Sequence, residues 1–353
     1  GSEMCIRDSV TIIPIEAVSA VQYMSSWPWE WAKPMGALMK DGSISTIGLF
    51  AVYVIIAIFS LLNYWSVKLL TSFTSLISVF KLGVPLLTII MLMISGFDTN
   101  NYGHSASAFM PYGSAPIFAA TTTSGIIFSF NAFQTIINMG SEIKNPEKNI
   151  ARGIAISLTL SAILYIVLQS TFITSMPSSM IHEHGWNGIN FNSPFADMAI
   201  LLGINWLAIL LYVEAVVSPF GTGVSFVAVT GRVLRAMEKN GHIPKFLGKM
   251  NEQYNIPRVA IVFNAIISMI MVTLFRDWGT LAAVISTATL VAYLTGPTTV
   301  ISLRKMAPKM TRPFKANILK FMAPLSFVLA SLAIYWAMWP TTCLLYTSPS
   351  PRD

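Results

Sequence analysis

The sequence predicts an all-α integral membrane protein, and three observations carry that prediction. The 353 residues are 54% hydrophobic and only 10% charged, with a mean hydropathy of +0.64, whereas soluble domains carry about 25% charged residues. Apolar runs of about 20 residues, the length that spans a bilayer, follow one another along the chain. Lys and Arg gather in alternate loops between these runs. Despite the net charge of +7, a nucleic-acid-binding protein, a disordered chain and a soluble enzyme are disfavoured.

The two ends of the chain differ in character from the rest of the sequence. Residues 1–9 and 342–353 resemble translated sequencing-adapter sequence and fit neither a signal peptide nor a helix-forming pattern. Both cysteines, Cys5 and Cys343, lie in these ends, so no disulfide or thiol chemistry is predicted. The transmembrane domain is therefore expected to be residues 10–341, a fragment cut at both ends.

Nine apolar runs within this domain predict nine transmembrane helices. In chain order they are Val10–Trp27, Ile47–Tyr64, Thr74–Ile94, Ile117–Asn138, Gly153–Met176, Asn205–Val233, Val259–Phe275, Thr280–Leu303 and Phe321–Trp339. The segment SPFADMAILLG, residues 193–203, is apolar enough to form a short helix over the outer mouth of the bundle.

The charges in the loops predict the orientation. One set of alternate loops holds 16 Lys and Arg residues: Lys68, Lys144, Lys148, Arg152, Arg232, Arg235, Lys239, Lys245, Lys249, Arg258, Arg304, Lys305, Lys309, Arg312, Lys315 and Lys320. The opposite set holds three: Lys33, Lys40 and Arg276. Because positive charge favours the cytoplasmic side, the first helix is predicted to run outward.

The fourth span carries an unusual number of polar residues. TTTSG at residues 121–125 is a poor helix-forming sequence, and Ser129, Asn131 and Gln134 follow at mid-membrane depth. Irregular backbone at that depth requires protein or a water-filled cavity beside it. The alternative interpretation is that these polar groups hold neighbouring helices together.

The sixth span combines a proline, two glycines and a row of hydroxyls. Pro219 removes a backbone hydrogen bond, and Gly221 and Gly223 loosen the following turn. One helical face carries three hydroxyls, those of Ser218, Thr222 and Ser225. They either bond their own backbone carbonyls or form a wall of a substrate or cation site.

Three ionisable residues lie within predicted spans, namely Glu16, Lys81 and Glu214. A charge at the bilayer centre costs at least about 2.5 kcal/mol, so each is a functional candidate, with a buried structural pair as the alternative. The four histidines fall in loops without a ligand spacing. No metal site, phosphate loop or nucleophile motif is recognised, and an enzyme is not predicted.

Two cytoplasmic motifs resemble those of a known family. They are SEIKNPEKNIARG, with Glu142, Asn145, Pro146 and Arg152, and TGRVLRAMEKNGHIPKFL from Thr230 to Leu247. The chain resembles amino acid permeases of the amino acid–polyamine–organocation superfamily over helices three to eleven of twelve. Within that family it is most similar to bacterial aspartate–proton symporters, through LLNYWSVK, VLQSTFI and SPFADMAILLGINWLA.

The resemblance implies a truncated LeuT-like fold with inverted repeats, in which helix six is broken at mid-membrane. The break and the substrate contacts would then fall at Phe128, Ser129, Phe130, Asn131 and Ala132, where relatives usually have glycine in place of Ala132. Glu16 and Glu214 are further candidates for substrate binding.

Lys81 matches a lysine of helix five that, in proton-coupled relatives, occupies the position of a bound cation. Ser218 and Thr222 are its expected neighbours. The coupling ion would be a proton, and no other cofactor is expected. A lysine at this position can take up and release a proton as the cavity changes access.

The resemblance favours a secondary transporter that imports an amino acid, such as aspartate or glutamate, with a proton by alternating access. An exchanger of the same superfamily and a substrate-sensing membrane protein that does not transport remain alternatives. The expected partners are the amino acid and the lipid bilayer, without nucleic acid, and the oligomeric state is left open. The expected location is the bacterial inner membrane, as a multi-pass protein.

Overall fold

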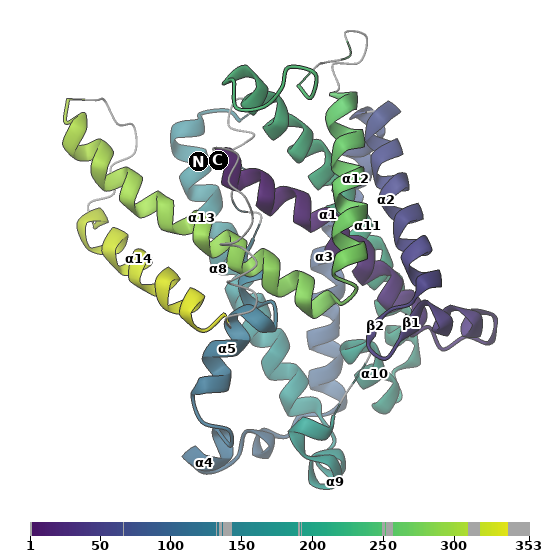
Figure 1. Cartoon of the computed structure of the whole chain (residues 1–353). Coiled ribbons are helices and arrows are strands. Elements are labelled where there is room, and N and C mark those ends of the chain that lie inside the picture. The colour runs from purple at the N-terminus through teal and green to yellow at the C-terminus, as the bar shows by residue number, and fades with distance from the viewer. Residues whose placement is uncertain are drawn as a thin grey trace.

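The computed structural model describes residues 2–65, 67–131, 133, 136, 143–189, 191, 193–248, 251, 257–309 and 318–337. The longer helices and the two halves of the fourth span are α1 (Ser2–Ser25), α2 (Thr46–Trp65), α3 (Val67–Ser95), α5 (Ala115–Thr123), α6 (Ile126–Ser129), α8 (Pro146–Ser175), α11 (Asn205–Lys239), α12 (Arg258–Leu274), α13 (Trp278–Met306) and α14 (Leu319–Tyr335) (Figure 1). Each predicted span except the fourth coincides with one of these helices.

Short elements lie in the loops. They are η1 (Glu30–Leu38), β1 (Met39–Lys40), β2 (Ser43–Ile44), η2 (Thr99–Tyr102), α4 (Ala106–Phe109), α9 (Ser178–Gly188) and α10 (Pro194–Leu201). The two strands pair antiparallel, with Met39 opposite Ile44 and Lys40 opposite Ser43. In Figure 1, α4 and α9 both lie at the bottom of the molecule.

Five helical segments among the described residues are long and apolar enough to cross a membrane. They are Thr46–Tyr64, Leu76–Ser95, α8, α11 and α13, whereas the apolar helices α12 and α14 are shorter. One expectation about the chain end was wrong, because α1 begins at Ser2 and includes residues for which no helix was expected. Once a helix has formed, each added residue costs little, so an apolar helix extends into a weak neighbouring sequence.

The fourth span is interrupted, as the resemblance implied, but the interruption begins earlier than expected. The helix α5 ends at Thr123, and Gly125 follows in the left-handed conformation, with φ 74° and ψ 15°. The single turn α6 then ends at Ser129. The break therefore begins at Ser124 and Gly125, ahead of the predicted Phe128–Ala132 segment, because a left-handed residue stops the helical hydrogen-bond ladder.

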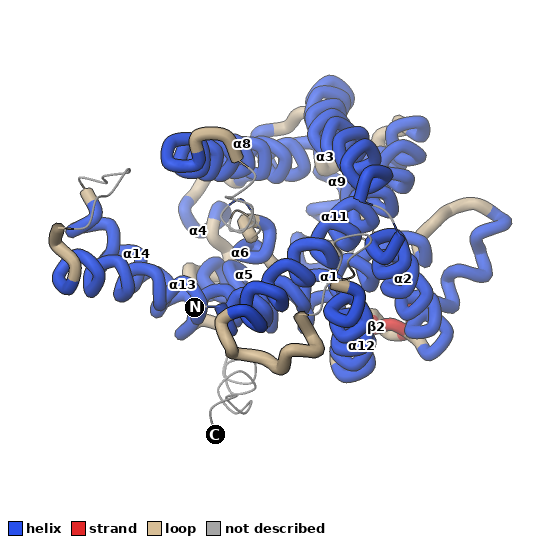
Figure 2. The backbone as a smooth tube through the Cα atoms, turned by 90° about the horizontal axis from the view of Figure 1, so that it is seen from above, coloured by secondary structure: helices blue, strands red, loops and turns tan. Residues whose placement is uncertain are grey.

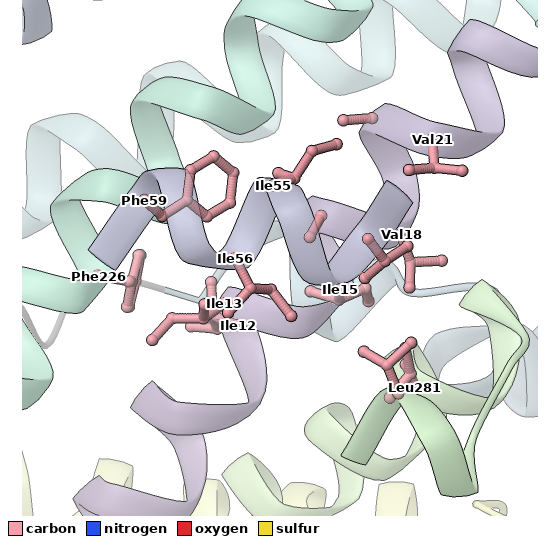
Figure 3. Packing of buried hydrophobic residues seen from close by; sticks show 14 of the residues in the cluster. Ile12, Ile13, Ile15, Val18, Val21, Ile55, Ile56, Phe59, Phe226 and Leu281 are labelled. Carbon is pink, nitrogen blue, oxygen red and sulfur yellow. The ribbon is translucent and has the colours of Figure 1, made fainter. Parts of the chain in front are cut away.

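The helix α1 lies at the centre of the bundle, between α2, α11, α12 and α13 (Figure 2). The core packs apolar side chains from these helices around it, including Ile13 of α1, Phe59 of α2, Phe226 of α11 and Leu281 of α13 (Figure 3). Since lipid tails are as apolar as these side chains, close packing rather than escape from water holds membrane helices together.

The contact between α2 and α11 shows how close that packing is. A Cβ atom placed on Gly223 would overlap the ring of Phe59, so only glycine allows this approach. The buried amide of Asn63 donates from Nδ2 to the carbonyl oxygen of Val224 over 2.8 Å and to that of Phe59 over 2.9 Å. In contrast to the prediction, α11 runs without interruption through Pro219.

Candidate functional site

The three ionisable residues predicted within the membrane come together at α1, α3 and α11. Lys81 of α3 donates a hydrogen bond from Nζ to Oγ1 of Thr222 on α11. Glu214 and Ser218 lie one turn apart on α11. Lys81 also interacts electrostatically with both Glu16 of α1 and Glu214. One lysine and two carboxylates therefore share one electrostatic environment.

A polar cavity of about 260 Å³ lies beside this group. Its lining comes from α1, from α10 and the residue before it, and from α11: Glu16, Ser19, Tyr23, Ser193, Pro194, Phe195, Ala196, Leu211, Tyr212, Glu214, Ala215, Ser218 and Pro219. Carboxylates and hydroxyls dominate its polar surface. Such a site suits a cation, a proton or water better than an anion.

The short helix α10 covers one end of the cavity, as the sequence predicted for residues 193–203. The hydroxyls of Ser26 and Ser193 share a hydrogen bond of 2.6 Å, which ties the start of α10 to the end of α1. Asp197 accepts from the backbone N–H of Ser193 over 3.0 Å and from the hydroxyl of Tyr212 over 3.2 Å. These bonds hold α10 against both helices that carry the glutamates.

The residues predicted at the break of the fourth span lie apart from that cavity. Phe128 packs edge-on against Trp278 of α13, with ring centroids 6.4 Å apart. Phe130 packs against Tyr165 of α8, with centroids 5.4 Å apart, and the Tyr165 hydroxyl donates to the carbonyl oxygen of Ser129 over 3.2 Å. The segment is therefore held between α8 and α13.

The polar side chains of the same segment bond nearby groups. The Ser129 hydroxyl donates to the carbonyl oxygen of Ile126 over 2.7 Å. Asn131 Nδ2 donates to Oγ1 of Thr289 on α13 over 3.4 Å. Ala132 and Gln134 lie outside the described residues. Among the described residues, the structure thus divides the predicted site residues into two groups, and Glu16 and Glu214 belong with Lys81 rather than with Phe128.

Two hydroxyls of the row on α11 bond their own backbone carbonyls, as one of the two interpretations predicted. Thr222 Oγ1 donates to the carbonyl oxygen of Ser218 over 3.3 Å, and Ser225 Oγ donates to that of Gly221 over 2.8 Å. These are backbone bonds of the kind common in membrane helices. Thr222 at the same time accepts the hydrogen bond of Lys81, so its oxygen serves the helix and the lysine together.

Tyr23 and Tyr212 also line the cavity, and neither was predicted to be a site residue. Tyr23 follows Glu16 by seven residues and Ser19 by four, a spacing that places all three on one face of a helix. That spacing was a usable signal. The sequence offers no such signal for Tyr212, because its hydroxyl is hydrogen-bonded to Asp197 of another helix, α10. No group of three or more His, Cys, Asp and Glu side chains that could hold a metal ion occurs in the part of the chain that the structure describes.

The fold and this site define a multi-pass membrane protein with charged groups buried between long apolar helices. The model of the amino acid permease family matches residues 8–350, and the chain belongs to that family. The proteins of that family are membrane transporters with the LeuT-like fold and not enzymes, in agreement with the resemblance.

Several characterised relatives are similar over most of the chain. It is 48% identical over 333 residues to the glutamate/serine transporter AimA of Bacillus subtilis (strain 168), covering 94% of the chain and 61% of that protein. It is 34% identical over 342 residues to the aspartate–proton symporter of the same organism, covering 96% of the chain and 64% of the symporter. The chain thus spans somewhat less than two thirds of the length of either relative, and it shares more identity with the glutamate/serine transporter.

Proposed function

We propose that this chain forms part of a secondary transporter that moves an acidic or small polar amino acid together with a proton across the bacterial inner membrane. The proposal of an amino acid substrate is supported by family membership and by the relatives named for transport of glutamate, serine and aspartate. The proposal of a proton as coupling ion is supported by the printed name of the second relative and by the position of Lys81.

The hydrogen bond between Lys81 and Thr222 is the observation that carries the proposed coupling. It joins α3 to α11, two helices that pack directly against one another. A protonated lysine donates to this hydroxyl and supplies a positive charge between the helices, whereas a neutral lysine supplies none. The protonation state of Lys81 therefore changes how strongly the two helices attract, which is what alternating access requires of a coupling residue.

The substrate contacts are proposed for the interrupted fourth span. Phe128, Ser129, Phe130 and Asn131 follow the break at Gly125 and face α8 and α13. Irregular backbone at mid-membrane depth is tolerated only beside protein or a water-filled cavity, which favours a polar ligand beside this segment. An acidic amino acid is expected there rather than beside Glu16 and Glu214, because two carboxylates in one cavity repel a third.

The test uses residues 10–337 exchanged for the equivalent segment of the full-length glutamate/serine transporter, reconstituted into liposomes. Labelled glutamate, aspartate and serine are offered with and without an inward proton gradient. We expect accumulation that depends on the gradient, and loss of that dependence in Lys81→Ala. Lys33→Ala is the matched control, because Lys33 lies exposed in a loop and pairs with Glu30 over 2.5 Å.

Each other outcome identifies an alternative. Homologous exchange that ignores the proton gradient would favour an exchanger, and binding without any uptake would favour a sensing protein. Gradient-driven uptake that survives Lys81→Ala would contradict the coupling role of this lysine. A chimera that neither binds nor moves any of the three amino acids would contradict the proposed function itself.

A further inference from the structure

The hydrogen bonds on α11 connect Lys81 to the cavity through one face of the helix. Glu214, Ser218 and Thr222 follow one another at intervals of four residues, so their side chains lie one above the other. Glu214 and Ser218 both line the cavity, and Thr222 bonds both the Ser218 carbonyl and Lys81. Two turns of helix, about 12 Å, thus separate the backbone positions at the two ends of this row.

This row is aligned with the expected direction of transport. The loop before α11 is predicted outside and the loop after it inside, so Glu214 lies nearer the outer surface than Thr222 and Lys81. Glu214 lines the cavity that α10 covers, together with Glu16 and Tyr23. A proton that enters from the outer side therefore meets the carboxylates before it meets the lysine.

The charges in this region favour a shared proton. The titratable groups that face Glu214 are Glu16 and Tyr23 from α1, Lys81 from α3 and Tyr212 from α11 itself, and Asp197 of α10 is bonded to Tyr212. With Lys81 neutral and both glutamates ionised, the group carries two negative charges. One proton reduces that sum to one negative charge, whether it is held by Glu214 or by Lys81, and this lowers the cost of holding the group within the membrane.

We propose that Glu214 is a second coupling residue, which receives the transported proton from the outer cavity and passes it to Lys81. This inference rests on the proposed function. In the transfer, the O–H bond of the Glu214 carboxyl breaks and an N–H bond forms on the neutral Lys81 amine, leaving a carboxylate and an ammonium. Lys81 has by then released its previous proton to water on the inner side. Along α11, Ser218 lies between Glu214 and Thr222, and the hydroxyls of both residues can donate and accept a hydrogen bond.

The alternative role for Glu214 is contact with the amino group of the substrate. The described residues of the fourth span do not line its cavity, so the carboxylate lies apart from the proposed substrate contacts. The two roles differ in an assay that needs no net proton movement. Exchange of substrate for substrate requires substrate binding but not proton release.

The experiment compares proton-driven uptake with substrate counterflow in the same full-length chimera. For Glu214→Gln, which keeps the shape of the side chain, we expect a roughly hundredfold loss of gradient-driven uptake of labelled glutamate. Counterflow should stay within about twofold of the parent protein, since the substrate contacts are intact. Glu30→Gln is the matched control, because Glu30 is an exposed glutamate outside the cavity.

A second variant tests the residue between Glu214 and Thr222 on α11. Ser218→Ala removes the cavity hydroxyl that lies one turn from both Glu214 and Thr222, and it should shift the pH profile of uptake while leaving counterflow unchanged, an effect that a purely structural serine would not produce. Loss of counterflow in Glu214→Gln would overturn the inference and assign Glu214 to the substrate. Unchanged gradient-driven uptake in that variant would also overturn it. If the parent chimera transports nothing in either assay, the proposed function fails, and the inference fails with it.

Discussion

The fourth and sixth spans carry similar helix-breaking signals, yet only the fourth is broken. In the fourth, Gly125 takes a left-handed conformation between α5 and α6. In the sixth, α11 continues for 35 residues through Pro219, Gly221 and Gly223. The comparison shows that a residue able to interrupt a helix does so according to what surrounds it.

Packing accounts for the difference. Pro219, Gly221 and Gly223 are all buried, and α11 lies against α1, α2, α3 and α12. Neighbouring helices on several sides hold its axis straight, so the missing hydrogen bond at Pro219 is tolerated. By contrast, α5 and α6 pack chiefly on α13, and Ser124 beside the break is exposed. Fewer neighbouring helices there hold the helix axis straight.

The largest loss of stability is expected from a substitution where α11 is packed most closely. Gly223→Leu places a side chain into the ring of Phe59 and should lower the free energy of unfolding by about 3 kcal/mol. Thermal unfolding in detergent, followed by size-exclusion chromatography, measures the change. Gly296→Leu is the control, since no atom lies within 4 Å of a Cβ at that position of α13. Equal unfolding midpoints for the two variants would contradict the packing explanation.

The next largest loss of stability is expected from a substitution at Gly125, where the fourth span is interrupted. Gly125→Ala forces a side chain into a backbone with φ 74° and brings its Cβ against Trp278, at a cost of about 2 kcal/mol. Gly125→Asn should cost less, because asparagine tolerates the left-handed conformation. Thermal unfolding of both variants checks the ranking. If alanine and asparagine behave alike, the contact with Trp278 rather than the dihedral angle limits this position.

A smaller effect is expected from the bond that holds α6 to α8. Tyr165→Phe removes the hydroxyl that donates to the Ser129 carbonyl over 3.2 Å but keeps the ring beside Phe130. The expected loss is about 1 kcal/mol. Tyr335→Phe, at a residue that is 80% exposed, serves as the control for losing a tyrosine hydroxyl. An unchanged unfolding midpoint for Tyr165→Phe would show that ring packing alone holds α6 in place.

The smallest effect is expected at Pro219. Pro219→Ala restores a backbone donor within an already continuous helix but removes buried ring contacts, so the net change should stay within about 1 kcal/mol. Unfolding of the variant measures it, alongside counterflow in the chimera. A loss of several kcal/mol, or of counterflow, would show that the proline shapes α11 in a way that its unbroken course does not reveal.

The sequence predicted most of the helices and part of the site for one physical reason. Long apolar runs, their charge-marked loops and the spacing of residues along a single helix are local properties, so α10 and the shared face of Ser218 and Thr222 could be read in advance. The fourth span could not, because polar residues in a membrane helix are compatible with a continuous helix, a break or a helix contact. The start of the break at Gly125 rather than at Phe128 followed from its surroundings.

By itself, then, the sequence determined the class of protein and the few ionisable residues within the membrane spans, because insertion into lipid depends on composition and periodicity. Only the tertiary structure decided which of those residues meet. It placed Glu16 and Glu214 on one cavity, close enough to interact electrostatically with Lys81, and it placed Phe128 against Trp278, since these contacts join segments far apart in the chain. Their meeting depends on how α1, α3, α11 and α13 pack, and no local pattern encodes that packing.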